Sequence, residues 1–467
     1  MTSPMTNWKY IYFVGIGGIG MSALARWFKA NGFQVAGYDK TLTTLVQTLI
    51  DEDIKVNLED EVSAIPAEFI QDPDHTLIIY TPAVPVQHKQ MFYFRDHNFL
   101  ILKRSQVLGM LTKNLRTVGV AGTHGKTTTS SIIAHILRHA QVNSTAFLGG
   151  ITQNYGTNLL LNEPTDHLES VVCVVEADEF DRSFLTLYPE IAIVTSTDAD
   201  HLDIYGKHEA VLESFREFVS QIDEEGALFM KHGLEIGSAT KADVFTYSLS
   251  EGNFRAADIR IQNARFLFDI IHPEGIIKEV AMMIPGYHNI ENSIAAAAVA
   301  LYLGVPGEKI KQALESYRGV KRRFEYQVES ENKVYIDDYA HHPAEIEAFL
   351  KSVKALYPDK HVTAVFQPHL FTRTRDFADE FAESLSLADR LLLLEIYPAR
   401  ELPIEGVTSQ MLLDKISITD KSIVSKQELL QLLLTLDTEV IVTIGAGDID
   451  TLVQPIKNLF VVPVTNI

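Results

Sequence analysis

Two glycine-rich loops, each following a short apolar run and preceding a helical pattern, constrain the fold of this chain more than any other feature. The first loop, residues 15–20, follows the apolar run 10–14, and the second, residues 122–126, follows the run 117–121. A strand, a glycine turn and a helix N-terminus together present backbone N–H groups to phosphate. Because each loop needs a sheet of its own, the pair predicts two separate α/β domains.

The rest of the chain extends this pattern. Further β-rich runs alternate with helical patterns, and those that matter most lie at residues 171–176, 191–196, 333–337, 361–366, 390–395 and 439–444. At roughly 100–200 residues per domain, 467 residues correspond to about three domains. We therefore expect an α/β protein of three domains: a Rossmann-like domain over residues 1–111, a central P-loop ATPase domain with a mainly parallel sheet over 112–322, and a Rossmann-like α/β domain over 323–467.

Composition limits the partners of the chain. The formal net charge is −21, and a field of this sign repels nucleic acid and anionic lipid. Cys173 is the only cysteine, which suits a reducing compartment, and no apolar run of ~20 residues or secretory leader is evident. We expect a cytoplasmic protein that binds neither nucleic acid nor membrane, and nothing in the sequence predicts its oligomeric state.

The first loop has the G-x-G-x-x-G spacing of diphosphate-binding turns, with Gly15, Gly17 and Gly20 at the three positions and Gly18 between them. Asp39 ends the next expected strand, where a carboxylate commonly meets a ribose. Taken alone, the loop indicates a nicotinamide-dependent oxidoreductase, but a nucleotide sugar offers the same diphosphate and ribose. A glycine turn that only packs a helix on a strand is the remaining interpretation.

The second loop indicates ATP binding. Its residues are Gly122, Thr123, His124, Gly125, Lys126, Thr127 and Thr128. In such a loop Lys126 would reach the β- and γ-phosphates and Thr127 would ligate Mg²⁺. The strict P-loop pattern has a further glycine where this chain has Val120, so the loop is a variant.

Acidic side chains follow two of the expected strands of the central domain, at residues 176–179 and 198–203. Carboxylates at the C-terminal ends of strands, beside a phosphate loop, suit Mg²⁺ shared with phosphate oxygens, although such clusters are usually solvated turns. Further on, Asn289 and Asn292 could share one face of a helix start and contact an adenine edge, or Asn289 could simply cap the helix.

Basic side chains and histidines gather in the third domain, at residues 322–324, 337–343 and 367–375. Guanidinium groups just past a strand suit carboxylates and phosphates, which they bind through two parallel hydrogen bonds. By residue type alone, Asp, His and Glu345 could also form a metal site, and a solvated basic turn is the third interpretation.

In this order, these motifs resemble the Mur ligase family of ATP-dependent amide-forming enzymes. The resemblance covers residues 15–22, 122–128, 176–179, 200–201, 288–292, 322–324, 337–343 and 367–375, with later matches at 395–401 and 445–448. It implies a first domain that binds a UDP-sugar, a central ATPase domain, and a third domain that closes over an amino acid.

The resemblance also implies residue roles. For the UDP-sugar these are Gly15, Gly17, Gly18, Gly20, Met21, Ser22, Asp39 and Thr81. For ATP they are residues 122–128 with Asn289 and Asn292 near adenine, Asp338 near ribose and Arg323 near the γ-phosphate. Mg²⁺ would be held by Thr127, Glu176 and His201. The amino acid would be held by His369 and Arg373, with Arg375 as a further candidate, and catalysis would rest on Lys126 and Arg323, with His341 or His342 as guesses for the base.

Two departures from the family pattern matter. Several Mur ligases carry a carbamylated lysine where this chain has Phe215, and the alanine-adding branch also lacks it. Many members have an arginine where this chain has Leu370. The resemblance therefore implies an ATP- and Mg²⁺-dependent ligase that joins L-alanine to the lactyl carboxylate of UDP-N-acetylmuramate in peptidoglycan precursor synthesis. Alternatives are a recycling ligase that adds a murein tripeptide to the same sugar nucleotide, a nicotinamide oxidoreductase, and a non-catalytic nucleotide-binding regulator.

Overall fold

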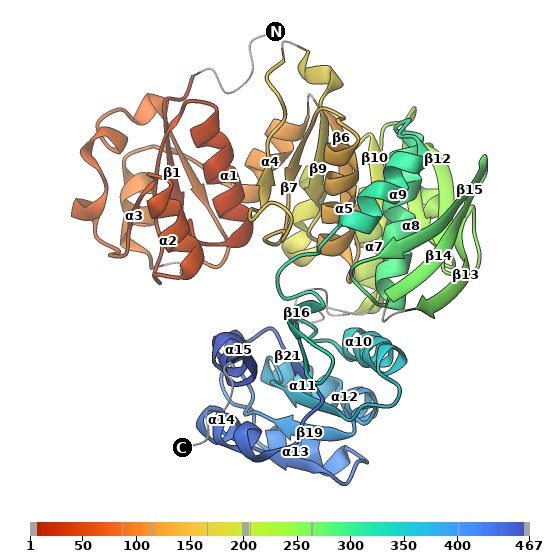
Figure 1. The fold of residues 1–467 in the computed structure, drawn as a ribbon. Coiled ribbons are helices and arrows are strands. Elements are labelled where there is room, and N and C mark those ends of the chain that lie inside the picture. Colours follow the sequence, from red (N-terminus) through yellow and green to blue (C-terminus); the bar gives the residue numbers. More distant parts are fainter. Residues whose placement is uncertain are drawn as a thin grey trace. The chain divides into compact units, whose positions relative to one another are not determined.

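The computed structural model describes residues 7–85, 87–113, 115–165, 167–198, 205, 207–262, 265–399 and 401–461. Its contacts form two compact units, one of Met1–Arg255, Ile271–Gly275 and Asn292–Ala313, the other of Ala256–Ile270, Ile276–Glu291 and Leu314–Ile467. Three sheets run through the chain (Figure 1). The predicted α/β class is confirmed, and the three sheets correspond to the three expected domains, whose boundaries stay a prediction.

The N-terminal sheet is parallel throughout, with the strand order β3-β2-β1-β4-β5. Its strands are β1 (Tyr10–Val14), β2 (Gln34–Tyr38), β3 (Lys55–Asn57), β4 (Thr76–Tyr80) and β5 (Leu100–Lys103), and its helices are α1 (Ile19–Ala30), α2 (Thr44–Asp51), α3 (Lys89–Asp96) and α4 (Arg104–Thr112). This order places the first glycine loop at the C-terminal end of the central strand β1. Ligands bind at that position in Rossmann-type sheets.

The central sheet has ten strands in the order β15-β14-β13-β12-β11-β10-β6-β9-β7-β8. They are β6 (Arg116–Ala121), β7 (Ser144–Phe147), β8 (Leu159–Leu160), β9 (Val172–Glu176), β10 (Ile191–Val194), β11 (Ala227–Lys231), β12 (Asp243–Ser248), β13 (Phe254–Gln262), β14 (Arg265–His272) and β15 (Gly275–Met282). Its helices are α5 (Lys126–His139), α7 (His208–Ser220), α8 (Tyr287–Tyr302) and α9 (Gly307–Ser316). The strands from β13 to β7 are parallel, as expected for a mainly parallel sheet, and β8 is antiparallel to β7.

Within the first unit, the N-terminal sheet and the parallel part of the central sheet share one apolar core. It includes Phe13 of β1 and Phe28 of α1 from the N-terminal part, and Phe184 with Phe215 and Phe218 of α7 from the central part, all fully buried. Helix α1 also contacts β7 and β8 of the central sheet. This shared core places the two glycine loops within one compact body.

The C-terminal sheet has the order β16-β17-β21-β18-β19-β20, with only the edge strand β16 antiparallel. Its strands are β16 (Glu325–Glu329), β17 (Val334–Asp338), β18 (Val362–Phe366), β19 (Arg390–Leu393), β20 (Lys421–Ile423) and β21 (Val440–Ile444). Its helices are α10 (Pro343–Leu356), α11 (Phe371–Asp376), α12 (Ala378–Leu385), α13 (Ser409–Lys415), α14 (Lys426–Thr435) and α15 (Val453–Val461). Strands β17, β18 and β21 are wholly buried, which is typical of parallel strands covered on both faces.

Helix α8 begins at Tyr287, so Asn289 and Asn292 both lie in its first turns, as the sequence predicts for two residues at a helix start. Gly286, with a positive φ of 121°, ends the preceding segment and lets the chain turn into the helix. In the part of the chain that the structure describes, no helix is long and apolar enough to span a membrane.

Candidate active site

The second glycine loop is fixed to the residues that follow β10. The Ser196 hydroxyl accepts a hydrogen bond from the backbone N–H of His124 at 2.8 Å and lies 2.8 Å from the Thr123 hydroxyl. Gly122 has a φ of +133°, and a Cβ on it would lie 2.0 Å from the Thr195 hydroxyl. The loop therefore needs glycine here, and its backbone is held in place before any phosphate binds.

Lys126 is the charged centre of this loop. Its Nζ donates to Glu179 Oε1 at 2.8 Å and to the Gly122 carbonyl at 2.6 Å. Burial acts to lower the pKa of Lys126, but the nearby carboxylates of Glu179, Asp178 and Glu176 outweigh it and raise that pKa. The ammonium group is thus cationic at neutral pH and held by Glu179, which the sequence analysis did not assign a role.

Two oxygen-bearing side chains next to Lys126 suit a magnesium ion. The Thr127 hydroxyl lies 3.1 and 3.0 Å from the two carboxylate oxygens of Glu176. Two oxygens bound at right angles to Mg²⁺ at 2.0–2.1 Å are about 2.9 Å apart, so the pair has the spacing of neighbouring ligands. Gly149 lies against the same carboxylate, because a Cβ there would be 2.0 Å from Glu176 Oε2.

His201, the third expected metal ligand, lies outside the described residues, as do residues 199–204 as a whole. Among the described residues, no group of three or more His, Cys, Asp or Glu side chains could hold a metal ion. Thr127 and Glu176 therefore remain predicted ligands, supported by their spacing.

The two asparagines of α8 contact the protein itself. Asn292 Oδ1 accepts a hydrogen bond from the Thr129 hydroxyl at 3.2 Å and would be 2.7 Å from a Cβ on Gly125. Asn289 is buried and donates to the Pro285 carbonyl at 2.7 Å. Asn292 thus supports the phosphate loop, and the adenine role of both residues stays a prediction.

In the first glycine loop, Asp39 has a structural contact. Its Oδ2 accepts a hydrogen bond from the Gly17 N–H at 2.8 Å, and its Oδ1 accepts one from Thr41 at 3.2 Å. Gly15, with a φ of +86°, lies so close to Thr81 that a Cβ would be 2.7 Å from the threonine methyl. The end of β2 and the residues after β4 therefore both hold this loop, and their contact with a nucleotide stays a prediction.

Met21 and Ser22 are buried in α1 rather than open to a ligand. The Ser22 hydroxyl donates to the Ile19 carbonyl at 2.8 Å and accepts from Asn158 Nδ2 at 3.0 Å. Asn158 is fully buried and belongs to the central sheet, next to β8. These contacts join the first loop to the central domain inside the first unit, so the predicted substrate role of Met21 and Ser22 has no direct support.

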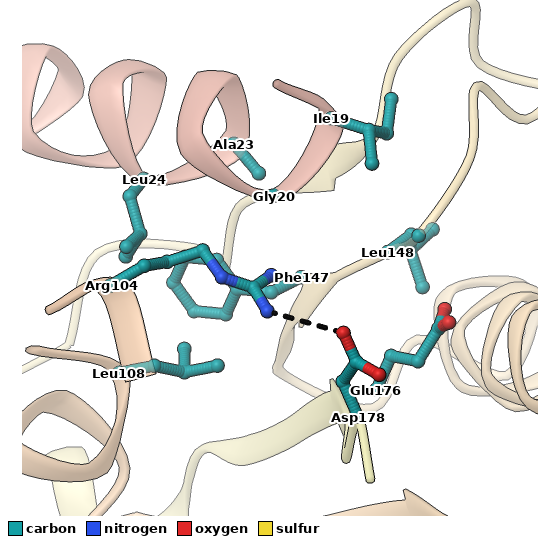
Figure 2. Close-up of a pocket in the computed structure, with 11 residues that line it drawn as sticks. Ile19, Gly20, Ala23, Leu24, Arg104, Leu108, Phe147, Leu148, Glu176 and Asp178 are labelled. Carbon is teal, nitrogen blue, oxygen red and sulfur yellow. Dashed lines mark ion pairs between the residues drawn. The ribbon is translucent and has the colours of Figure 1, made fainter. Parts of the chain in front are cut away.

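A pocket of about 100 Å³ lies next to the first glycine loop in this unit (Figure 2). Four elements contribute: the start of α1, the start of α4, the end of β7 and the end of β9. The lining residues are Ile19, Gly20, Ala23, Leu24, Arg104, Leu108, Phe147, Leu148, Gly149, Glu176 and Asp178. The pocket therefore connects the predicted UDP-sugar loop with the predicted metal ligand Glu176.

The second unit holds a cluster of charged and aromatic groups after β17. Asp338 is buried, and its two carboxylate oxygens each accept a backbone N–H at 2.7 Å, from Phe324 and from Ala340. Burial raises the pKa of Asp338 to about 6, against the lowering effect of the Arg323 charge. Asp338 thus fixes the backbone next to Arg323, and its ribose role stays a prediction.

His341 and His342 follow this segment and differ in their contacts. His342 caps α10: its Nδ1 accepts from the Ala344 N–H at 3.4 Å. His341 Nδ1 lies 3.0 Å from the Tyr339 carbonyl, so in the neutral ring that nitrogen carries the proton and Nε2 is the acceptor. Burial lowers the pKa of His341 to about 4, although Glu345, 3.4 Å away, acts to raise it.

The candidate amino-acid residues lie near this histidine. The rings of His341 and His369 are 6.2 Å apart, and His369 stacks on Tyr397 at 5.7 Å. Arg373 is buried, and its charge acts on the pKa of His341. Arg375 is exposed and bonded to Asp376 at 2.7 Å, which makes it the weaker candidate.

Arg104 and Gly149 line the pocket but carry no prediction from the sequence, because their place depends on which segments meet in space and no local pattern around them indicates it. Glu179 was predicted only as a member of the acidic run after β9, and its contact with Lys126 was not foreseen.

The comparisons with known proteins agree with this arrangement. The Mur ligase family catalytic domain matches residues 10–116, the Mur ligase middle domain matches 120–300, and the Mur ligase glutamate ligase domain matches 322–447. The chain belongs to the Mur ligase family of ATP-dependent ligases. The confirmed family agrees with the resemblance seen in its motifs.

Particular relatives resemble it along its whole length. A UDP-N-acetylmuramate–L-alanine ligase of Phocaeicola vulgatus is 50% identical over 97% of this chain and 98% of its own, and the ligase of that name from Christiangramia forsetii is 49% identical over 96% and 97%. The crystal structure of a UDP-N-acetylmuramate-alanine ligase from Thermotoga maritima superimposes with a TM-score of 0.80 at 27% identity, covering 96% of this chain and 98% of that one.

Proposed function

We propose that this chain joins L-alanine to the lactyl carboxylate of UDP-N-acetylmuramate, using ATP and Mg²⁺, in the cytoplasmic phase of peptidoglycan precursor synthesis. The observation that carries the proposal is that relatives named for this activity match the chain from end to end. The chain includes residues that match all three Mur ligase domains. Lys126, Thr127 and Glu176 supply the ATP chemistry that such a reaction requires.

The UDP-sugar binds at the first glycine loop in this proposal, and ATP binds at the second. A carboxylate is a poor acyl donor, because its leaving group would be oxide. Transfer of the γ-phosphoryl group to a lactyl oxygen gives an acyl phosphate and ADP, and it creates a better leaving group. Phosphoryl transfer depends mainly on positioning and on neutralising charge, which are the roles of Lys126 and Arg323.

Thr127 and Glu176 would hold Mg²⁺ in this scheme, together with His201. The ion would neutralise charge on the phosphate oxygens while it is bound there. Lys126 is held by Glu179 in the structure, so its ammonium group is positioned before the nucleotide binds.

The second step is attack of the alanine amine on the acyl carbon. The C–N bond forms, the bond to phosphate breaks, and the amine proton must be accepted by a base. His341 is the better candidate because it is neutral at pH 7 and has Nε2 as an acceptor, while the Nδ1 of His342 caps α10. Arg373 would hold the alanine carboxylate and so orient the amine.

Phosphate release tests the proposed function. With ATP, Mg²⁺ and UDP-N-acetylmuramate present, we expect release to depend on L-alanine, and to stop when either the UDP-sugar or the amino acid is left out. The tripeptide L-Ala-γ-D-Glu-meso-diaminopimelate should not replace L-alanine. Release that requires the tripeptide would assign the chain to the recycling reaction, and release that requires neither acceptor would contradict ligase activity.

A further inference from the structure

Arg104 occupies a position in the first unit that none of the roles above explains. It is the first residue of α4, and its guanidinium lies over the start of α1: a Cβ on Gly20 would be only 2.0 Å from Arg104 Nη1. From there the side chain points toward Asp178, with 3.7 Å between Nη2 and the carboxylate (Figure 2). Among the described residues that line the pocket, Arg104 is the only cation.

The pair that Arg104 forms with Asp178 is weak. At 3.7 Å the two groups are beyond hydrogen-bond distance, and both side chains are partly exposed, at 27% and 40%. Exposed pairs of this kind contribute little to stability, because water screens both charges. An incoming carboxylate that makes two short hydrogen bonds to the guanidinium would therefore replace Asp178 at low cost.

We propose that Arg104 is a binding residue for the lactyl carboxylate of the UDP-sugar, and that the Asp178 carboxylate pairs with the Arg104 guanidinium until the substrate binds. This inference rests on the proposed function and adds a specificity residue to it. Arg104 lies between Gly20, at the UDP-sugar loop, and the end of β9, where Glu176 faces the same pocket. A carboxylate held there would be next to the predicted metal ligand.

The other walls of the pocket suit the group that carries this carboxylate. Leu24, Leu108 and Phe147 are apolar and buried, and they line the pocket together with Arg104. A lactyl ether has a methyl group next to its carboxylate, so it offers one apolar and one anionic contact over a short span. A diphosphate offers only anionic oxygens, which leaves the apolar wall without a partner.

Gly20 provides a second way to test the position of Arg104. Its backbone carries no positive φ, so alanine is conformationally acceptable in this helix, and the obstacle is the guanidinium itself. Gly20→Ala should displace Arg104 without removing its charge. Because Gly20 itself belongs to the predicted UDP-sugar loop, this variant should weaken both UDP-sugars, and UDP-N-acetylmuramate by the larger factor if Arg104 binds the lactyl carboxylate.

Calorimetric titration of the whole chain with two ligands tests the inference. UDP-N-acetylmuramate carries the lactyl carboxylate, and UDP-N-acetylglucosamine has the same diphosphate and a closely similar sugar without it. Since losing hydrogen bonds to a charged group costs at least about tenfold, Arg104→Gln should bind UDP-N-acetylmuramate at least about tenfold more weakly and UDP-N-acetylglucosamine within about twofold of the unaltered chain. Asp178→Asn should bind UDP-N-acetylmuramate up to about fivefold more tightly, because a competing carboxylate is gone.

Arg95→Gln is the matched control, because Arg95 is an exposed arginine in α3 of the same domain. It should bind both ligands like the unaltered chain. Equal weakening of both ligands in Arg104→Gln would place the guanidinium on the diphosphate and overturn the inference, as would unchanged affinity for both. If Arg104→Gln is poorly folded, Arg104→Lys decides by the same criteria, because it keeps the charge but loses the planar pair of donors. Failure of the unaltered chain to bind UDP-N-acetylmuramate would instead contradict the proposed function itself.

Discussion

Two arginines of the third domain, Arg373 and Arg375, differ in how strongly the surrounding protein fixes their side chains. Arg373 is buried beside the His341 cluster, whereas Arg375, two residues on, is exposed and bonded to its neighbour Asp376. A buried guanidinium keeps a fixed orientation, and an exposed one loses binding energy to solvent and to its neighbour. The two arginines of one short helix are therefore suited to different roles.

Replacing Arg373 by lysine should raise the KM for L-alanine by at least about tenfold, because lysine keeps the charge but loses the planar pair of donors that fits a carboxylate. The KM for ATP should change by less than about twofold. Steady-state kinetics with each substrate varied in turn measure both values. Arg375→Lys is the control and should leave both unchanged. If Arg373→Lys raised the KM for ATP instead, Arg373 would be a phosphate ligand.

At the level of elements, the candidate active site lies at the C-terminal ends of strands and the N-termini of the helices that follow. The end of β9 carries Glu176, the start of α5 carries Lys126 and Thr127, and the end of β7 carries Gly149. Parallel neighbouring strands bring these ends to one edge of the sheet. A substitution in one of these segments should therefore displace a side chain that belongs to another.

Gly149→Ala tests this dependence. The new Cβ would lie 2.0 Å from Glu176 Oε2, so the carboxylate must move away from Thr127. We expect the Mg²⁺ concentration for half-maximal activity to rise by about tenfold or more, with a smaller effect on the KM for the UDP-sugar. Kinetics over a Mg²⁺ series measure this.

Gly275→Ala is the matched control, since a Cβ there would be 3.6 Å from its nearest neighbour and the backbone has no positive φ. It should respond to Mg²⁺ like the unaltered chain. An unchanged Mg²⁺ requirement in Gly149→Ala would mean that Glu176 is not a metal ligand.

The elements around the two glycine loops could be predicted from the sequence because glycine spacing, apolar runs and helix patterns are local signals. Strands β13–β15 were not identified. In β14, for example, Phe266, Phe268 and Ile270 are buried and the residues between them are partly exposed. This pattern fits a sheet with one solvated face but matches no sequence motif.

Within the candidate site, the closeness of Lys126, Thr127 and Glu176 could be predicted because each belongs to a motif of fixed spacing, and their ligand roles stay predictions. The place of Arg104 could not be predicted, because it depends on a contact between α4 and α1 that no local pattern encodes. The hydrogen bond from Gly17 to Asp39 is a structural contact that the motif does not reveal, and the nucleotide role of Asp39 stays a prediction. Sequence motifs indicate which residues can bind ligands, and the packing of distant segments determines which other residues lie beside them.

At the scale of the whole molecule, buried histidines should couple stability to pH. His135 in α5 bonds to the Tyr155 hydroxyl at 2.8 Å, and burial lowers the pKa of both His135 and His341 to about 4. A histidine with a lowered pKa in the folded state stabilises the fold above its unfolded pKa of about 6.5, and this contribution is lost as pH falls toward 4. Asp338, whose pKa is raised to about 6, acts in the opposite direction.

Thermal midpoints measured between pH 7 and 4 should therefore fall by several degrees, and His135→Gln should reduce the slope, since glutamine does not titrate and can still accept from Tyr155. The comparison of slopes isolates this residue from the carboxylates, which titrate in both proteins. Equal slopes in the two proteins would show that His135 is already protonated or exposed.

Phe215, at the position where several Mur ligases have a carbamylated lysine, leads to a prediction for the activity of the whole enzyme. Phe215 is fully buried and packs edge-on against Phe184 at 5.3 Å, so this position belongs to the apolar core. Activity should require Mg²⁺ but be the same, within about 20%, in CO₂-depleted and bicarbonate-supplemented buffer. Loss of activity in depleted buffer that bicarbonate restores would indicate a carbamylated lysine elsewhere.

The fate of the two carboxylate oxygens of UDP-N-acetylmuramate tests the proposed mechanism most directly. If ATP activates the lactyl carboxylate for attack by L-alanine, one of these oxygens is transferred to phosphate. With both carboxylate oxygens labelled as ¹⁸O, mass spectrometry should find one labelled oxygen in each phosphate released and one in the new amide carbonyl. Phosphate without label, or an amide that retains no label, would contradict an acyl-phosphate ligase.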